Sequence, residues 1–284
     1  MIISASYRSD IPAFHGDWFL AALAAGEVAV TNPYSQRPYT VDLRADAVDG
    51  YVFWTRNARP FSRALSAVAA QGKPFVVQYT IIGYPRAIDT NVIDPSLAIA
   101  NARAIAESYG PRVVVWRYDP ILLTPDTETD WHRANFARLA DALAGIADEV
   151  VVSFAQLYAK SARNLAKAGI TCRQPEPEER TGLIIALRET AAHRGITLSL
   201  CTQPDLTATS NTPGARCVDA VRLGDIAGRP VAAALKGNRP GCLCAESRDI
   251  GAYDSCVHGC RYCYAVGDHE AVQRRMRRER RSAG

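Results

Sequence analysis

Six short apolar runs recur between amphipathic stretches, and this alternation restricts the fold more than any other feature of the chain. Several runs are continuous, such as VVVW and VVVSF, as expected for parallel strands that are covered on both faces. Helix signatures separate them; Asp94 and Pro95 begin one helix and Gly110 ends it. The pattern predicts an α/β protein with a parallel sheet. Because a closed eightfold barrel needs two more repeats, we expect an open, TIM-like partial (β/α)6 barrel. The predicted strands are 2–6, 51–55, 75–81, 112–118, 150–154 and 197–201.

Polar side chains follow the predicted strands, at the edge where α/β proteins bind ligands. Arg8, Arg56 and Arg117 are the candidate catalytic residues, because three guanidinium groups at one mouth suit an anionic ligand. Lys160 and Arg163 would extend this positive patch. Ordinary helix caps and loop ion pairs are the alternative for any one of these positions. The full set is Arg8, Asp10, Trp54, Arg56, Asn57, Gln78, Thr80, Arg117, Asp119, Ser153, Gln156, Tyr158, Cys201 and Thr202.

The positive charge is concentrated at one end of the chain. The net charge is +4, yet residues 274–284 contain six Arg and one Glu, and the rest of the chain has 27 basic against 28 acidic side chains. That balance does not fit a basic nucleic-acid-binding domain. We expect residues 266–284 to form a solvated, flexible tail that does not bind nucleic acid. With no signal peptide or membrane span in the sequence, we expect a cytoplasmic protein.

The cysteines are crowded rather than scattered. None of the eight occurs before Cys172, and five lie between Cys242 and Cys263, which indicates a ligand set. A short helix is expected at 218–226, but turn residues dominate the rest of this region, so a metal centre is the obvious source of order. We therefore divide the chain into a barrel (1–200), a Cys-rich segment at the barrel mouth (201–265) and the basic tail (266–284).

The spacing Cys256-x3-Cys260-x2-Cys263 places three thiols on one tight loop. A 4Fe–4S cluster normally takes four Cys, so three ligands leave one iron open to another ligand. This spacing, with Tyr262 before the last Cys, resembles the signature of the radical S-adenosylmethionine (SAM) superfamily. The resemblance implies a partial barrel, a 4Fe–4S cluster on the three Cys, and bound SAM with Tyr262 against its adenine. It further implies cleavage of SAM to a 5′-deoxyadenosyl radical, with electrons from a donor such as flavodoxin or ferredoxin.

A narrower resemblance covers nearly the whole chain. The stretches SASYRSDIPAFHGDWF, YVFWTRN, VVWRYDPILLT and RPGCLCAESRDIGAYDSCVHGCRYCYA are similar to the bacterial domain-of-unknown-function family 1848, from Ile3 to about Ala265. In the radical SAM superfamily the three-Cys loop follows the first strand, whereas here it follows the last. Only the three Cys and Tyr262 can therefore be transferred from the superfamily.

Four further cysteines would complete a second cluster. A fully ligated auxiliary 4Fe–4S cluster takes four Cys, and the resembled family carries Cys at the same four places. Cys172 is then left over, with a structural role. As alternatives, Cys201 and Cys217 are buried thiols, the cysteines bind zinc, or they form disulfides. His258 is either a neighbour of the first cluster or a solvent-facing loop residue. The auxiliary ligands are Cys201, Cys217, Cys242 and Cys244.

Three functions follow from these observations. The first is a radical SAM enzyme that abstracts hydrogen from a small anionic substrate, nucleotide-like or carboxylated, with an auxiliary cluster that donates sulfur or accepts an electron. The second is a non-catalytic iron–sulfur electron-transfer protein. The third is a zinc-stabilised module that binds nucleic acid through its Arg tail. An Arg-lined mouth favours the enzyme, since neither alternative needs a pocket.

Overall fold

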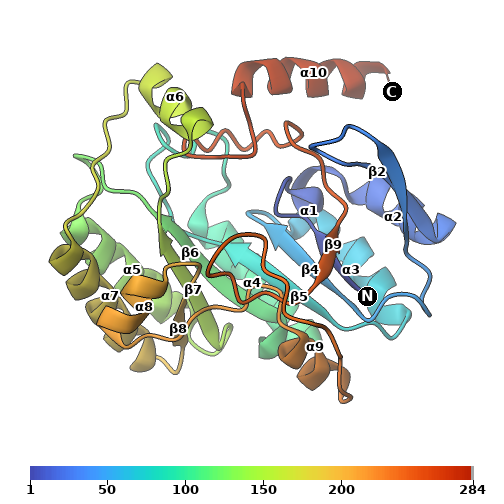
Figure 1. Cartoon of the computed structure of the whole chain (residues 1–284), viewed down its shortest axis with the longest axis horizontal. Helices are drawn as coiled ribbons and strands as arrows, with labels where there is room; N and C mark the ends of the chain where they lie inside the picture. The colour runs from blue at the N-terminus through green and yellow to red at the C-terminus, as the bar shows by residue number, and fades with distance from the viewer. Residues whose placement is uncertain (283–284) are drawn as a thin grey trace.

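The computed structural model describes residues 1–282, and its centre is a seven-stranded parallel sheet (Figure 1). The strand order is β8-β7-β6-β5-β4-β1-β9. The outer strands β8 and β9 are not paired with each other, so the described chain forms no closed barrel. This confirms the α/β class and is consistent with a partial TIM-like barrel. The strands are β1 (Ile2–Ala5), β4 (Gly50–Thr55), β5 (Phe75–Thr80), β6 (Val114–Ile121), β7 (Glu149–Phe154), β8 (Thr197–Leu200) and β9 (Ser247–Asp249).

All six predicted strands are present, and both of their faces are buried. On one face Val52, Val76, Val115 and Val151 pack with Leu223 and neighbouring residues of the C-terminal region. The alternate residues of the same strands pack into the main core beneath the outer helices. The continuous apolar runs therefore reflect a sheet with protein on both sides. The one clear shift is in β6, which begins at Val114 because Pro111–Val113 forms a 3-10 turn.

Helices follow the strands and cover the outer face of the sheet (Figure 1). The predicted helix ends are found in α4, where Asp94 accepts a hydrogen bond from the backbone N–H of Ser96 and Gly110, with φ of 93°, ends the helix. The predicted helix at 218–226 is α9. The helices are α1 (Ile11–Phe14), α2 (Gly16–Ala25), α3 (Ser62–Ala70), α4 (Pro95–Tyr109), α5 (Thr129–Leu143), α6 (Ala159–Lys167), α7 (Pro177–Ala192), α8 (Pro204–Ser210), α9 (Ala220–Ala227) and α10 (His269–Ser282).

Three elements differ from the sequence prediction. An antiparallel hairpin, β2 (Glu27–Thr31) with β3 (Pro38–Asp42), lies outside the main sheet. The strand β9 was not predicted and pairs in parallel with β1. The predicted flexible tail is instead the helix α10 over most of its length, because Val272 and Met276 give this Arg-rich segment an apolar face that packs on the protein. Residues 283–284 of the predicted tail lie outside the described residues.

No helix within residues 1–282 combines the length and the apolar character needed to cross a lipid bilayer.

Candidate active site and thiol clusters

A cavity of about 260 Å³ lies at the carboxyl ends of the strands, where the sequence predicted a ligand site. Asn57 and Gln78 do not line it: Asn57 accepts a hydrogen bond from the backbone of Arg59, and Gln78 lies behind the wall of the cavity. The predicted polar residues that do line it are Arg8, Asp10, Trp54, Arg56, Thr80, Arg117, Asp119, Ser153, Gln156, Tyr158, Cys201 and Thr202. We call this space the central cavity.

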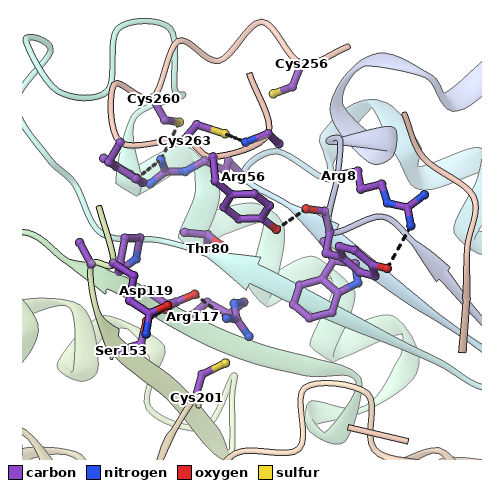
Figure 2. Close-up of a pocket in the computed structure, with 18 of the residues that line it drawn as sticks. Arg8, Arg56, Thr80, Arg117, Asp119, Ser153, Cys201, Cys256, Cys260 and Cys263 are labelled. Atoms are coloured by element: carbon purple, nitrogen blue, oxygen red, sulfur yellow. Dashed lines mark hydrogen bonds and ion pairs between the residues drawn. The ribbon is translucent and has the colours of Figure 1, made fainter. Parts of the chain in front are cut away.

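The three-Cys loop forms one wall of the central cavity. Cys256, Cys260, Cys263 and Tyr262 all line it, and Figure 2 shows the three sulfurs on one side with Cys201 on the opposite side. Burial raises the pKa of all three thiols of the loop. A buried thiol with a raised pKa becomes a stable thiolate only beside a compensating cation or metal centre. All eight cysteines are free thiols, so the disulfide alternative is not realised.

The loop is held by the segment that follows β5. Asp89 and Cys260 form an isolated antiparallel bridge, and the backbone N–H of Asn91 donates to the carbonyl of His258 over 2.8 Å. Between these contacts Gly259 has a φ of +72°, and a Cβ there would lie 3.1 Å from Thr90. A glycine is therefore required for the turn that brings Cys260 back to the cavity.

Arg56 connects this loop to β4 through one nitrogen. Its Nη1 donates to Asp89 over 2.8 Å, to the sulfur of Cys260 over 3.0 Å and to the hydroxyl of Tyr262 over 2.6 Å. Burial lowers the pKa of Arg56, but Asp89, Tyr262 and Cys260 outweigh it, so the pKa lies well above its ordinary value. Arg56 therefore positions a thiol and the tyrosine. Its buried Nε and Nη2 have no hydrogen-bond partner among the described residues.

The second predicted set of cysteines also comes together. The sulfurs of Cys201 and Cys217 lie 3.7 Å apart, and Cys244 accepts a hydrogen bond from the backbone of Val218 over 3.4 Å. A hydrogen bond with Cys244 lowers the pKa of Cys242 to about 6. Hydrogen bonds also join Cys244 to Cys217 and to Cys242, so the four thiols form one connected group, and Cys201 brings its edge to the central cavity. Cys172, in contrast, packs against the main core, away from both sets.

Two arginines donate to the second set of thiols. Nη1 of Arg117 lies 3.1 Å from the sulfur of Cys217, and its Nη2 binds Asp119. Nη2 of Arg239 lies 3.8 Å from the sulfur of Cys201, and sequence reasoning missed this residue because it lies in a turn-rich segment. Charged N–H groups beside thiolates stabilise their negative charge.

Among the three predicted arginines, Arg8 has the most exposed side chain, at 12%. Its Nε and Nη1 are buried without a hydrogen-bond partner in the described structure, although Nε lies 3.8 Å from Asp249. The guanidinium lies over the rings of Tyr7 and Tyr253, and Lys160 also lies over Tyr253, at 5.5 Å. Arg8 is therefore placed to bind an anion at the edge of the central cavity. Neither Lys160 nor Arg163 lines the cavity itself.

A buried Asp–His pair next to the loop was not predicted. Nε2 of His258 lies 2.7 Å from Asp10, whose carboxylate also accepts from Thr55 and from the backbone of Arg56. His258 is 3% exposed and packs on Phe14, so the solvent-facing interpretation is wrong. The periodic spacing of the sequence gives no signal for this pair, because its members are separated by 248 residues.

Asp249, at the end of β9, fixes the loop that carries Arg8. It accepts hydrogen bonds from Ser4 and Ser6 at 2.9 and 2.7 Å and from the backbone of Tyr7 at 3.0 Å. Burial raises the pKa of Asp249, and these hydrogen bonds oppose that shift. The last strand thereby orients the first loop of the site.

Within the described residues, no group of three or more His, Cys, Asp or Glu side chains is arranged to hold a metal ion. The two thiol groups are nevertheless of the right chemistry for iron–sulfur centres, because soft thiolates are the ligands these clusters take from proteins. Each group also has an arginine that donates to one of its sulfurs, which is a common outer contact of a ligating thiolate.

The comparisons with known proteins give one family. No curated protein matches the chain. One solved structure, a D-allulose 3-epimerase from Methylomonas sp., matches at 12% identity with a TM-score of 0.31, over 75% of this chain and 60% of that one. The chain thus spans less than two thirds of the epimerase, and so low a score supports no argument about the fold. Residues 2–265 match the family described as a domain of unknown function, DUF1848, and the chain belongs to this family.

Proposed function

We propose that this protein is a radical SAM enzyme that acts on a small anionic substrate. Cys256, Cys260 and Cys263 would hold a 4Fe–4S cluster, which, when bound with SAM, supplies one-electron cleavage to a 5′-deoxyadenosyl radical. A single observation supports the proposal: the three thiols of the loop, Tyr262 and Arg8, which has two donors without a partner in the described structure, line one cavity at the strand ends. The buried thiols suit a reducing compartment such as the cytoplasm.

The residues of the cavity have separate tasks in this proposal. Arg56 holds Tyr262 and Cys260 in place, while Arg8 binds the carboxylate or phosphate of a ligand. On the opposite wall Asp119 accepts from Ser153 and pairs with Arg117, which leaves a fixed polar surface for substrate groups.

The second thiol group would hold an auxiliary 4Fe–4S cluster. Because Cys201 lines the cavity, this centre would lie next to the substrate, which supports direct contact over remote electron relay. Sulfur insertion into the substrate is therefore one proposed reaction and redox rearrangement another. Single-turnover reaction with clusters rebuilt from labelled sulfide separates them: labelled product supports insertion, and unlabelled product with an intact second cluster excludes it.

Metal content tests the proposal directly. After anaerobic reconstitution with iron and sulfide, we expect about eight iron per chain, four per cubane. Cys256→Ala and Cys201→Ala should each retain about four, and the matched control Cys172→Ala should retain about eight. Cys256→Ala should also form no 5′-deoxyadenosine from SAM and dithionite. Stoichiometric zinc, with no visible iron–sulfur absorbance, would contradict the proposal.

A further inference from the structure

The helix α10 packs on the three-Cys loop through its apolar residues. Val272 and Met276 pack with Val266 into a small apolar cluster, against which Cys256 and Cys263 are packed. Both thiols are partly exposed, so the loop lies near the surface where α10 packs on it. Figure 1 shows α10 lying across the end of the molecule where the 250–265 segment runs.

The helix α6 extends the same surface. Asn164 donates to the carbonyl of Val266 over 3.0 Å, Arg163 donates to Gly267 over 3.4 Å, and Lys167 lies 3.6 Å from Glu270. These contacts join α6 to the start of α10, and the two helices lie at the same end of the molecule (Figure 1).

The outer side of these two helices is strongly basic. Arg274 is 64% exposed and Lys167 is 59% exposed, and their ion pairs with Glu270 are at 3.8 and 3.6 Å. Within the described side chains, the only exposed acidic groups on this surface are Asp268 and Glu270. We define the α6–α10 surface by its exposed basic residues, Arg163, Lys167, Arg274, Arg275, Arg277 and Arg278.

We propose that the α6–α10 surface docks an acidic one-electron carrier of the flavodoxin type, which reduces the centre held by Cys256, Cys260 and Cys263. The inference rests on the proposed function. Opposite charge steers association and sets orientation, and here it would bring the carrier to the helix that packs on Cys256 and Cys263. In this step one electron passes from the reduced flavin to the iron–sulfur centre. The flavin is oxidised, the centre is reduced, and no atom is transferred.

A nucleic acid is the other polyanion that such a surface could bind. We favour the protein carrier because the basic residues lie directly over the thiol loop, whereas a nucleic-acid site has no need of that position. The rest of the chain has slightly more acidic than basic side chains, and thus adds no further positive surface for a long polyanion.

The test uses the reconstituted full chain and a reduced acidic flavodoxin in a stopped-flow instrument, with flavin oxidation as the readout. We expect Arg274→Glu/Arg278→Glu to lower the second-order rate constant by about tenfold or more at low salt, with the difference shrinking as salt rises. Arg63→Glu/Arg103→Glu, on the outer helices α3 and α4, makes the same change of charge elsewhere and should leave the rate constant within about twofold.

Two further measurements keep the outcomes distinct. Dithionite should reduce the iron–sulfur centre to the same extent in both variants and the parent, as followed by electron paramagnetic resonance. A smaller signal in Arg274→Glu/Arg278→Glu alone would show damage to the centre and overturn the docking inference. Equal flavodoxin rates in both double variants would overturn it as well, as would tighter binding of a single-stranded oligonucleotide than of flavodoxin. If no iron–sulfur centre forms at all, the proposed function fails. Docking is then still tested by titrating the same protein with flavodoxin and measuring binding.

Discussion

Replacing Arg56 by methionine would leave a charged carboxylate buried without its cation. Asp89 is 3% exposed, and its Oδ1 lies 2.8 Å from Nη1 of Arg56. Its Oδ2 has no hydrogen-bond partner among the described residues, so Arg56 is the group that balances the negative charge of Asp89. Removing one partner of a buried ion pair costs about 3–5 kcal/mol. Against a total stability of about 5–15 kcal/mol, this is a large part of what keeps the fold intact.

The magnitude can be measured with a double-mutant cycle in urea, followed by circular dichroism on the cluster-free protein. We expect Arg56→Met to lower the free energy of unfolding by about 3–5 kcal/mol, and Arg56→Met/Asp89→Asn to recover at least half of that loss. As a control, Arg112→Met breaks two partly exposed pairs, with Asp148 and Asp225, and should lower the free energy of unfolding by no more than about 1 kcal/mol. A cost below about 1 kcal/mol for Arg56→Met, or a double variant no more stable than the single one, would refute the reasoning.

Three shorter predictions follow from other parts of the structure. Arg8→Ala should raise KM for the anionic substrate by about tenfold or more at unchanged iron content, and loss of iron would show that Arg8 is structural. Gly251→Ala should lower the melting temperature, because a Cβ there would lie 2.1 Å from Oγ of Ser6; Gly182→Ala, with nothing within 4 Å, should not. Burial lowers the pKa of His132 from its ordinary value of 6.5 to about 4. Between these two pH values His132 is therefore protonated in the unfolded chain and neutral in the folded chain. The free energy of unfolding should therefore fall by about 2 kcal/mol from pH 7 to pH 5, and His132→Gln should lack this decrease.

The strands could be predicted from the sequence because the two faces of the sheet are filled by different parts of the protein. That arrangement gives runs such as 150–152 consecutive apolar residues, which a strand with one exposed face would not have. The short strand β9 has the sequence SRD and could not be recognised, since its order comes from pairing with β1 and from the carboxylate of Asp249. The helix α10 was missed for a related reason: its apolar residues are too few to outweigh the arginines in a composition argument.

Most lining residues of the candidate site could be predicted, whereas Arg239, Asp89 and Asp249 and the contacts between the residues could not. Clustering and spacing indicated both sets of cysteines, and the structure brings each set together. The sequence does not show which side chains an arginine contacts, so Arg56 and Arg117 were grouped with Arg8 as ligand-binding residues. Their burial beside Asp89 and Asp119 gives them positioning contacts to thiols, which depend on the three-dimensional packing alone.

The pairing of β9 with β1 also determines when the site can form during synthesis. Ser4 and its partner Asp249 are separated by 245 residues, so the outer edge of β1 has no neighbour until β9 has left the ribosome. At about 5–20 residues per second, this interval is roughly 10–50 s. Over that time an unpaired strand edge can pair with other chains, and a folding helper or an early partner of the edge would prevent this. The loop that carries Arg8 therefore reaches its final shape only after Asp249 has been synthesised.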